Sequence, residues 1–123
     1  MSTDISYPTY YATAVERAIR LATLGESKLT AFHMAMEGMS SVKGRHFLNQ
    51  LCSIRCRTEA QGFHRPRYLE VGSWKGSTLC AATFGNDIDA VAIDDFSQFT
   101  TTTFGVDTRH PRDAVTQNLH LNR

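Results

Sequence analysis

Apolar residues in the first half of the chain recur at the spacing of an α-helix. A first stripe, at intervals of four, three and four residues, comprises Tyr11, Val15, Ala18 and Ala22. Gly25 is placed to end that helix, and Ser27 to cap the next one. A second stripe comprises Leu29, Phe32, Met36 and Met39, and a third comprises Phe47, Leu51 and Ile54. The third stripe predicts a helix from about Gly44 to Ala60, so we expect residues 1–64 to form a helical segment with the second stripe in its core.

The pattern changes after Pro66 to short β-prone runs separated by helical ones. Residues 67–72 are β-prone and end in glycine, and residues 77–84 are helical. Residues 88–93 are apolar after Asp89, as in a strand buried on both faces. A loop containing Thr100 to Thr103 follows, and Pro111 stands where the first residue of a last helix would fall. The order strand, helix, strand, helix predicts an α/β fold with a parallel sheet.

Composition and charge narrow the class of protein. The chain has 123 residues, of which 41% are hydrophobic and 20% charged, as in a folded domain. Thirteen basic against twelve acidic residues give a charge of +1, which argues against a strongly basic nucleic-acid binder. The N-terminus does not resemble a signal peptide, and no apolar run is long enough for a membrane helix. Together with the odd number of cysteines, these features predict a cytoplasmic protein without a nucleic-acid or membrane partner.

The turn after the first predicted strand carries the clearest chemical signal. Gly72 allows a sharp turn and the close approach of a ligand, because it has no Cβ. Gly76 allows a second tight position, and Ser77 is placed to cap the helix whose free N–H groups face the ligand. Such a turn lies at the carboxyl end of a parallel strand, where open α/β sheets bind ligands.

An acidic residue follows the turn at the distance expected for a nucleoside site. Asp94 lies 22 residues after Gly72, at the end of the second predicted strand, where an acid accepts hydrogen bonds from both ribose hydroxyls. The dinucleotide fingerprint needs a glycine where this chain has Trp74, and a bulky Trp fits badly beside a pyrophosphate. A ligand that carries an amino-acid tail instead of a pyrophosphate fits better.

Residues 69–78 (Leu-Glu-Val-Gly-Ser-Trp-Lys-Gly-Ser-Thr) and 90–97 (Ala-Val-Ala-Ile-Asp-Asp-Phe-Ser) resemble motifs I and II of class I S-adenosylmethionine-dependent methyltransferases, closest to the macrocin-type and sugar O-methyltransferases. The resemblance covers residues 67–118, with Gly-x-x-x-Gly in place of the commoner Gly-x-Gly-x-Gly. It implies that Glu70 lies near the methionine amino group and that Asp94 binds the ribose. It also implies a cofactor-binding turn that comprises Gly72, Ser73, Trp74, Gly76 and Ser77.

The resemblance further implies a Rossmann-like sheet of seven strands, of which this chain reaches the first two. We therefore expect residues 65–123 to be a partial S-adenosylmethionine-binding domain and the chain to be the N-terminal part of a longer enzyme, with little activity alone. The implied methyl acceptor is a small molecule or a sugar. Residues 1–64 would cap the cofactor pocket or build substrate or dimer contacts, which is compatible with a homo-oligomer. No residue is assigned a catalytic role.

Two other interpretations stay open at this point. In the first, the chain is part of an NAD-type oxidoreductase. In the second, it is a non-enzymatic interaction domain that uses its helical half to bind a partner. Trp74 either walls the cofactor or packs on the N-terminal helices, whereas Lys75 and Asp95 are expected to be solvated charges. Arg109, His110 and Arg112 gather in the loop expected to overhang the site, where binding of a substrate anion is the alternative to a solvated role.

The cysteines do not indicate a metal site. Cys52 and Cys56 are expected one helical turn apart, with His46 and His64 flanking them. The pair is not a Cys-x-x-Cys knuckle and no second pair follows, so buried structural cysteines are favoured over zinc ligands. Cys80 lies inside the predicted helix after the turn and is expected in the core.

Overall fold

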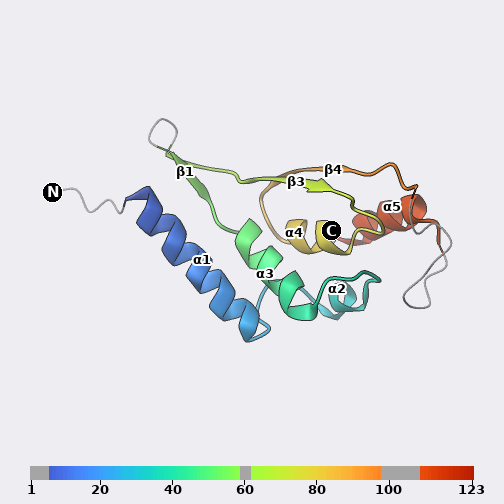
Figure 1. Cartoon of the computed structure of the whole chain (residues 1–123), viewed down its shortest axis with the longest axis horizontal. Helices are drawn as coiled ribbons and strands as arrows, with labels where there is room; N and C mark the ends of the chain where they lie inside the picture. The colour runs from blue at the N-terminus through green and yellow to red at the C-terminus, as the bar shows by residue number, and fades with distance from the viewer. Residues whose placement is uncertain (1–5, 59–61, 98–108) are drawn as a thin grey trace.

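The α-helices and β-strands alternate only in the second half of the chain. A computed structural model describes residues 6–58, 62–97 and 109–123, and Thr100 to Thr103 lie outside these ranges (Figure 1). The elements are α1 (Tyr7–Thr23), α2 (Ala31–Ala35), α3 (Val42–Cys52), β1 (Cys56–Thr58), β2 (Gly62–His64), β3 (Arg67–Val71), α4 (Ser77–Thr83), β4 (Asp89–Ile93) and α5 (Pro111–Leu121). Within these ranges the fold is mixed α/β, with two sheets of two strands each. None of the helices in the described ranges is long and apolar enough to span a membrane.

The first predicted helix is confirmed as α1. The Ser6 hydroxyl accepts a hydrogen bond from the Thr9 N–H, which caps the helix, and Gly25 follows its end with a φ of 72°. Ala18 and Ala22 are buried, in agreement with the predicted stripe. These local signals are enough to define the ends of α1.

The second predicted helix is much shorter than expected. It is the five-residue α2, and its N-cap is Thr30 rather than Ser27. The Ser27 hydroxyl instead lies 2.6 Å from His46 Nδ1 on α3 and accepts the Leu29 N–H. The expectation of one continuous apolar stripe in the core was wrong, because Met39 is 78% exposed in the connection that follows α2.

The third predicted helix also ends early. It is α3, which ends at Cys52. Cys56–Thr58, which were expected to continue it, form β1, and this strand pairs antiparallel with β2, with Cys56 opposite His64. Residues 59 and 60 of the predicted helix lie outside the described ranges. The hydroxyls of Tyr10 and Tyr11 donate to the carbonyls of Arg55 and Arg57 at 2.8 and 3.1 Å. These contacts from α1 hold the chain in an extended conformation at the point where local propensity alone favours helix.

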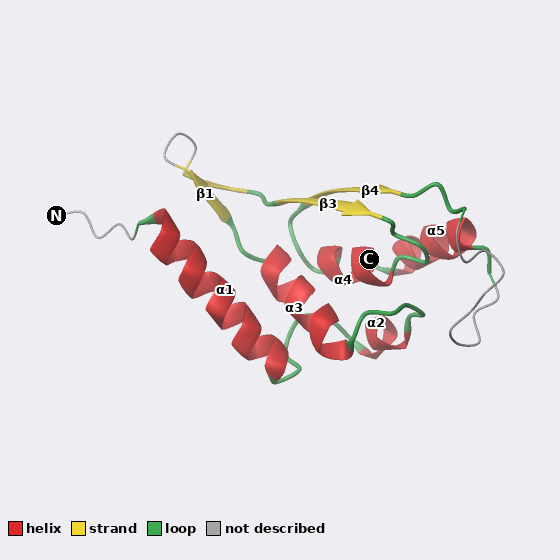
Figure 2. Ribbon diagram, viewed as in Figure 1, coloured by secondary structure: helices red, strands yellow, loops and turns green. Residues whose placement is uncertain are grey.

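The predicted parallel sheet is confirmed in β3 and β4. The two strands pair from Arg67 opposite Asp89 to Val71 opposite Ile93. All the helices of the described ranges lie on the same side of this pair (Figure 2). The opposite face carries apolar side chains that are 57–78% exposed: Leu69, Val71, Val91 and Ile93. The expectation of a strand buried on both faces was therefore wrong, since no described residue covers the outer face.

The core lies where α4 packs against α3 and α5. Its most buried side chains are small, with Cys80, Ala81, Ala82 and Ala114 all at 0% exposure. Small side chains allow the helix backbones to approach closely, which lets a polar side chain bridge them. Asn49 of α3, 1% exposed, donates to the carbonyls of Ala81 and Phe84 at the C-terminal end of α4. The opposite end of α4 begins at the predicted ligand-binding turn.

Candidate functional site

A cavity of about 650 Å³ opens at the carboxyl ends of β3 and β4. Its volume lies within the range of about 300–1,000 Å³ that is usual for small-molecule sites. Three parts of the chain line it: the α2–α3 connection, the turn between β3 and α4, and the end of β4. The lining residues are Gly38, Met39, Ser40, Val71, Gly72, Ser73, Trp74, Ser77, Thr78, Ile93, Asp94 and Asp95.

The structure brings most of the predicted site residues to this cavity. Those that line it are Gly72, Ser73, Trp74, Ser77 and Asp94, whereas Glu70 and Gly76 do not. The expectation that Ser77 caps α4 was wrong, since the N-cap is Gly76 and Ser77 is the first helical residue. Ser77 is nevertheless buried at the cavity, beside the α2–α3 connection.

The two glycines of the turn have different roles. Gly72 has a φ of 85°, and a Cβ added there would meet no atom within 4 Å. Gly76 has a φ of 91°, but a Cβ there would lie 2.8 Å from Cγ2 of Val115 on α5. Both residues therefore need glycine for their backbone conformation. Gly72 leaves open space for a ligand, and Gly76 allows α5 to pack closely against the turn.

Both carboxylate oxygens of Asp94 hold the backbone around the cavity. Oδ2 accepts the Trp74 N–H and Oδ1 accepts the Phe96 N–H, each at 2.7 Å. Trp74 and Phe96 are the described non-glycine residues with positive φ, at 46° and 58°. Such backbones are strained and persist only when their surroundings stabilise them. Because each carboxylate oxygen can accept about two hydrogen bonds, Asp94 retains acceptor capacity toward the cavity.

Glu70 lies on the helix side of β3, beneath the turn. It is 6% exposed, and its Oε1 accepts hydrogen bonds from the hydroxyls of Tyr68 and Thr78. Its Oε2 is buried without a hydrogen-bond partner in the described structure. Burial, and after it the hydrogen bond and charge of Glu70, raise the pKa of Tyr68 well above its usual value. This pair of strand residues therefore forms a buried polar group with one free acceptor.

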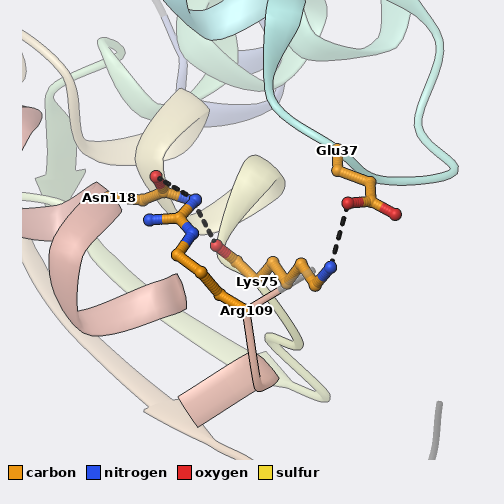
Figure 3. A network of polar contacts seen from close by, with 4 residues as sticks. All are labelled: Glu37, Lys75, Arg109 and Asn118. Carbon is orange, nitrogen blue, oxygen red and sulfur yellow. Dashed lines mark hydrogen bonds and ion pairs between the residues drawn. The ribbon is translucent and has the colours of Figure 1, made fainter. Parts of the chain in front are cut away.

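Lys75 is not the solvated charge that was expected. Its side chain is 1% exposed, and its Nζ lies 2.9 Å from Oε2 of Glu37, whose side chain is 6% exposed (Figure 3). Its carbonyl accepts from Nδ2 of Asn118 on α5 at 2.8 Å. Sequence reasoning missed Glu37, because nothing local to either residue indicates a partner 38 positions away.

The basic cluster before α5 does not line the cavity. Arg109 donates to Gln117 at 2.8 Å and to Asn118 at 3.3 Å, along α5. His110 accepts the Arg112 N–H and so caps α5, whose first residue is Pro111 as predicted. The Arg112 guanidinium lies 5.6 Å from the centre of the Phe96 ring. These contacts give the three side chains structural roles.

Asp95 lines the rim of the cavity and remains exposed, as expected. It accepts hydrogen bonds from the N–H and hydroxyl of Ser97, which hold the pKa of its carboxyl below the usual value. Its hydrogen bonds are therefore local to its own turn, unlike those of Asp94.

Cys52 and Cys80 are buried, as predicted, and burial raises the pKa of their thiols to about 11 and about 12. Cys56 begins β1 and is only half-buried, so the expectations that it is buried and that it shares a helix with Cys52 were both wrong. No group of three or more His, Cys, Asp or Glu side chains suited to a metal ion occurs in the part of the chain that the structure describes.

Comparison with known proteins adds no assignment to this geometry. No protein-family model, curated protein or solved structure matches the chain.

Proposed function

We propose that the chain binds S-adenosylmethionine and carries the cofactor site of a class I methyltransferase that methylates an oxygen of a small molecule or sugar. In this proposal β3, α4 and β4 are the first unit of a Rossmann-like sheet. The observation that carries it is the placement of Asp94 and the Gly72 turn on one cavity. An acid and a glycine turn at the ends of adjacent parallel strands are the arrangement that binds an adenosine ribose and its attached tail.

The chemistry of the residues fits this cofactor. Asp94 would accept the ribose hydroxyls, and the open backbone at Gly72 and Ser73 would bind the methionine part. Glu70, which the resemblance places near the amino group, is buried below the turn and does not line the cavity, so the proposal rests on Asp94 and the Gly72 turn and not on Glu70. The bound cofactor supplies an electrophilic methyl group on its sulfonium. Residues of this chain bind and orient it, and no general base is assigned among them.

Trp74 favours this cofactor over a dinucleotide. Its side chain lines the cavity at the position where a pyrophosphate-binding turn requires glycine. A methionine tail carries no phosphate and needs no such gap. The near-neutral charge of the chain is also sufficient for a ligand that is held by hydrogen bonds and shape.

Calorimetry with S-adenosylhomocysteine and with NAD tests the proposal. We expect the chain to bind S-adenosylhomocysteine and not NAD. Loss of hydrogen bonds to a charged acceptor costs about 1.5–3 kcal/mol, so Asp94→Ala should weaken binding by about 10- to 100-fold. Asp95→Ala, on the rim of the same cavity, is the matched control and should change the affinity by less than about threefold. A folded, monodisperse sample that binds NAD, or neither ligand, would contradict the proposal.

A further inference from the structure

The wall of the cavity opposite β4 belongs to the N-terminal half of the chain. Residues 36–40, the α2–α3 connection, contribute Gly38, Met39 and Ser40 to the lining. Arg45 of α3, 3% exposed, fixes the path of this connection. Its guanidinium donates to the carbonyls of His33 and Met36 at 2.6 and 2.8 Å and, through Nε, to Ser40 Oγ at 2.8 Å. The connection is therefore held in one conformation by a side chain from the following helix.

The α2–α3 connection passes directly over the start of α4. A Cβ added to Gly38 would lie 2.2 Å from Ser77 Oγ, which is closer than any contact between two such atoms. A side chain larger than hydrogen at this position would push the connection away from Ser77. The backbone at Gly38 thus closes the side of the cavity next to the N-terminal end of α4.

The buried Glu37–Lys75 ion pair joins this connection to the turn. Its two side chains are 6% and 1% exposed, and they come from opposite halves of the chain (Figure 3). Burying such a pair has a large desolvation cost, so it contributes little net stability and its effect is mainly on geometry. The pair fixes the position of residues 36–40 relative to residues 72–76.

Lys75 also controls the environment of the neighbouring tryptophan. Its ammonium lies 4.8 Å from the centre of the Trp74 ring, within the range of a cation–π interaction. Trp74 has a strained backbone and lines the cavity. The ion pair with Glu37 therefore places a fixed positive charge against the indole that forms part of the cavity wall.

We propose that Glu37 and Lys75 are positioning residues for the ligand site: their ion pair holds the α2–α3 connection and Trp74 together as one wall. The N-terminal helices are then a component of the cofactor site, not an independent unit beside it. The choice of S-adenosylhomocysteine as a probe rests on the proposed function, whereas the geometry of the wall does not.

The ligand-free protein provides the first test. Trp74 is the one tryptophan of the sequence, so its emission and its quenching by acrylamide report on this wall alone. We expect Glu37→Gln and Lys75→Met to shift the emission and to raise the quenching constant about twofold or more, as a half-buried indole becomes accessible. Asn49→Ala removes buried hydrogen bonds at the far end of α4 and is the control for general destabilisation. It should leave the emission unchanged.

The double variant Glu37→Gln/Lys75→Met separates positioning from stability. Removing both charges avoids an unpaired buried ion, so thermal stability should return close to that of the wild type. If the pair positions Trp74, the quenching constant of the double variant stays high. A double variant that recovers both stability and wild-type quenching would overturn the proposal, and so would single variants with unchanged emission. Glu37→Gln is nearly isosteric and carries the test if Lys75→Met does not fold.

Binding of S-adenosylhomocysteine provides the second test. The single and double variants should each bind about tenfold or more weakly than the wild type, and Asn49→Ala should bind within about threefold of it. Undiminished affinity in all three variants would overturn the positioning role. If the wild type binds no S-adenosylhomocysteine while the quenching still changes as expected, the proposed function fails and the described wall stands. If the wild type binds S-adenosylhomocysteine but the variants show the quenching of the wild type, the positioning role fails and the proposed function stands.

Discussion

The backbone N–H of Trp74 donates to Oδ2 of Asp94 at 2.7 Å, so the acid at the end of β4 holds the turn that follows β3. The other oxygen of the same carboxylate holds Phe96 in its own positive-φ conformation. Asp94 therefore does more than offer an acceptor to a ribose. It is the group that stabilises two strained positions at the cavity, and the shape of the site depends on it before any ligand binds.

Asp94→Ala is expected to lower the free energy of unfolding by about 2 kcal/mol, because two charge-assisted hydrogen bonds are lost. Part of this loss is offset as Trp74 relaxes from its strained backbone. Urea unfolding monitored by circular dichroism measures the change. The exposed Asp95→Ala should leave the free energy of unfolding close to that of the wild type. Equal effects of the two substitutions would show that Asp94 does not hold the turn.

The two glycines of the turn should respond differently to alanine. Gly72→Ala carries only the cost of a positive φ, about 1–2 kcal/mol, because the space above it is open. Gly76→Ala adds the collision with Val115, an overpacking cost of about 1–3 kcal/mol. Thermal or urea unfolding of both variants should therefore rank Gly76→Ala as the more destabilising.

A double-mutant cycle isolates the contact between Gly76 and α5. Adding Val115→Ala to Gly76→Ala removes the side chain that the new methyl group meets, so the two substitutions should be less destabilising together than the sum of their separate effects. The expected coupling is about 1–2 kcal/mol. Strict additivity would mean that α5 moves away from the turn and that the close approach is not needed.

The elements around the cavity could be predicted because their signals are local. The alternation of β3, α4 and β4 follows from apolar runs punctuated by Gly72, Gly76 and Gly85, and α5 begins at Pro111 as its φ restriction requires. The end of α3 could not be predicted in this way. It depends on the hydroxyls of Tyr10 and Tyr11, more than 40 residues away, which donate to the carbonyls of Arg55, just before β1, and of Arg57 within it.

In the candidate site, too, residues with local sequence signals could be predicted, and residues held by distant contacts could not. Gly72 and Asp94 were predicted from spacing and lie together on the cavity. The charge of Lys75 gave no indication of burial, because its partner Glu37 lies in a connection that the apolar pattern assigned to a helix. The path of the α2–α3 connection depends on Arg45, whose guanidinium donates to the carbonyls of His33 and Met36. Polar contacts between distant segments do not leave a periodic pattern.

The outer face of the β3–β4 pair should promote self-association. Leu69 and Val91 face each other across the two strands and are 64% and 60% exposed. Replacing them together by Lys and Glu is expected to reduce light scattering and the fluorescence of a bound hydrophobic dye, while the free energy of unfolding stays within about 0.5 kcal/mol. Ile19→Lys, at an isolated exposed position on α1, is the control and should leave the dye signal unchanged. A large loss of stability in the double variant would instead indicate that the face is packed.

Alkaline pH should destabilise the fold through its buried thiols. Burial, with a smaller contribution from Glu70, raises the pKa of Cys80 to about 12 from a usual value of 9.0, so the folded state binds this proton more tightly than the unfolded state. The stabilisation is then complete below pH 9 and is lost as pH rises from 9 toward 12, at up to about 1.4 kcal/mol per pH unit for each such thiol. Cys52, whose pKa is raised to about 11, loses its contribution over a narrower window.

Urea unfolding at pH 8, 9, 10 and 10.5 measures this dependence. Cys80→Ala should lower stability at pH 8 and make the decline above pH 9 less steep, because one of the groups that titrate differently in the two states is gone. Cys56→Ala, which removes a thiol that is only half-buried, is the control for the loss of a cysteine side chain. A Cys80→Ala variant whose stability falls as steeply as that of the wild type would show that the thiol is not the source of the alkaline sensitivity. The hydroxyl of Tyr68, whose pKa is also raised, would then be the next group to test, with Tyr68→Phe.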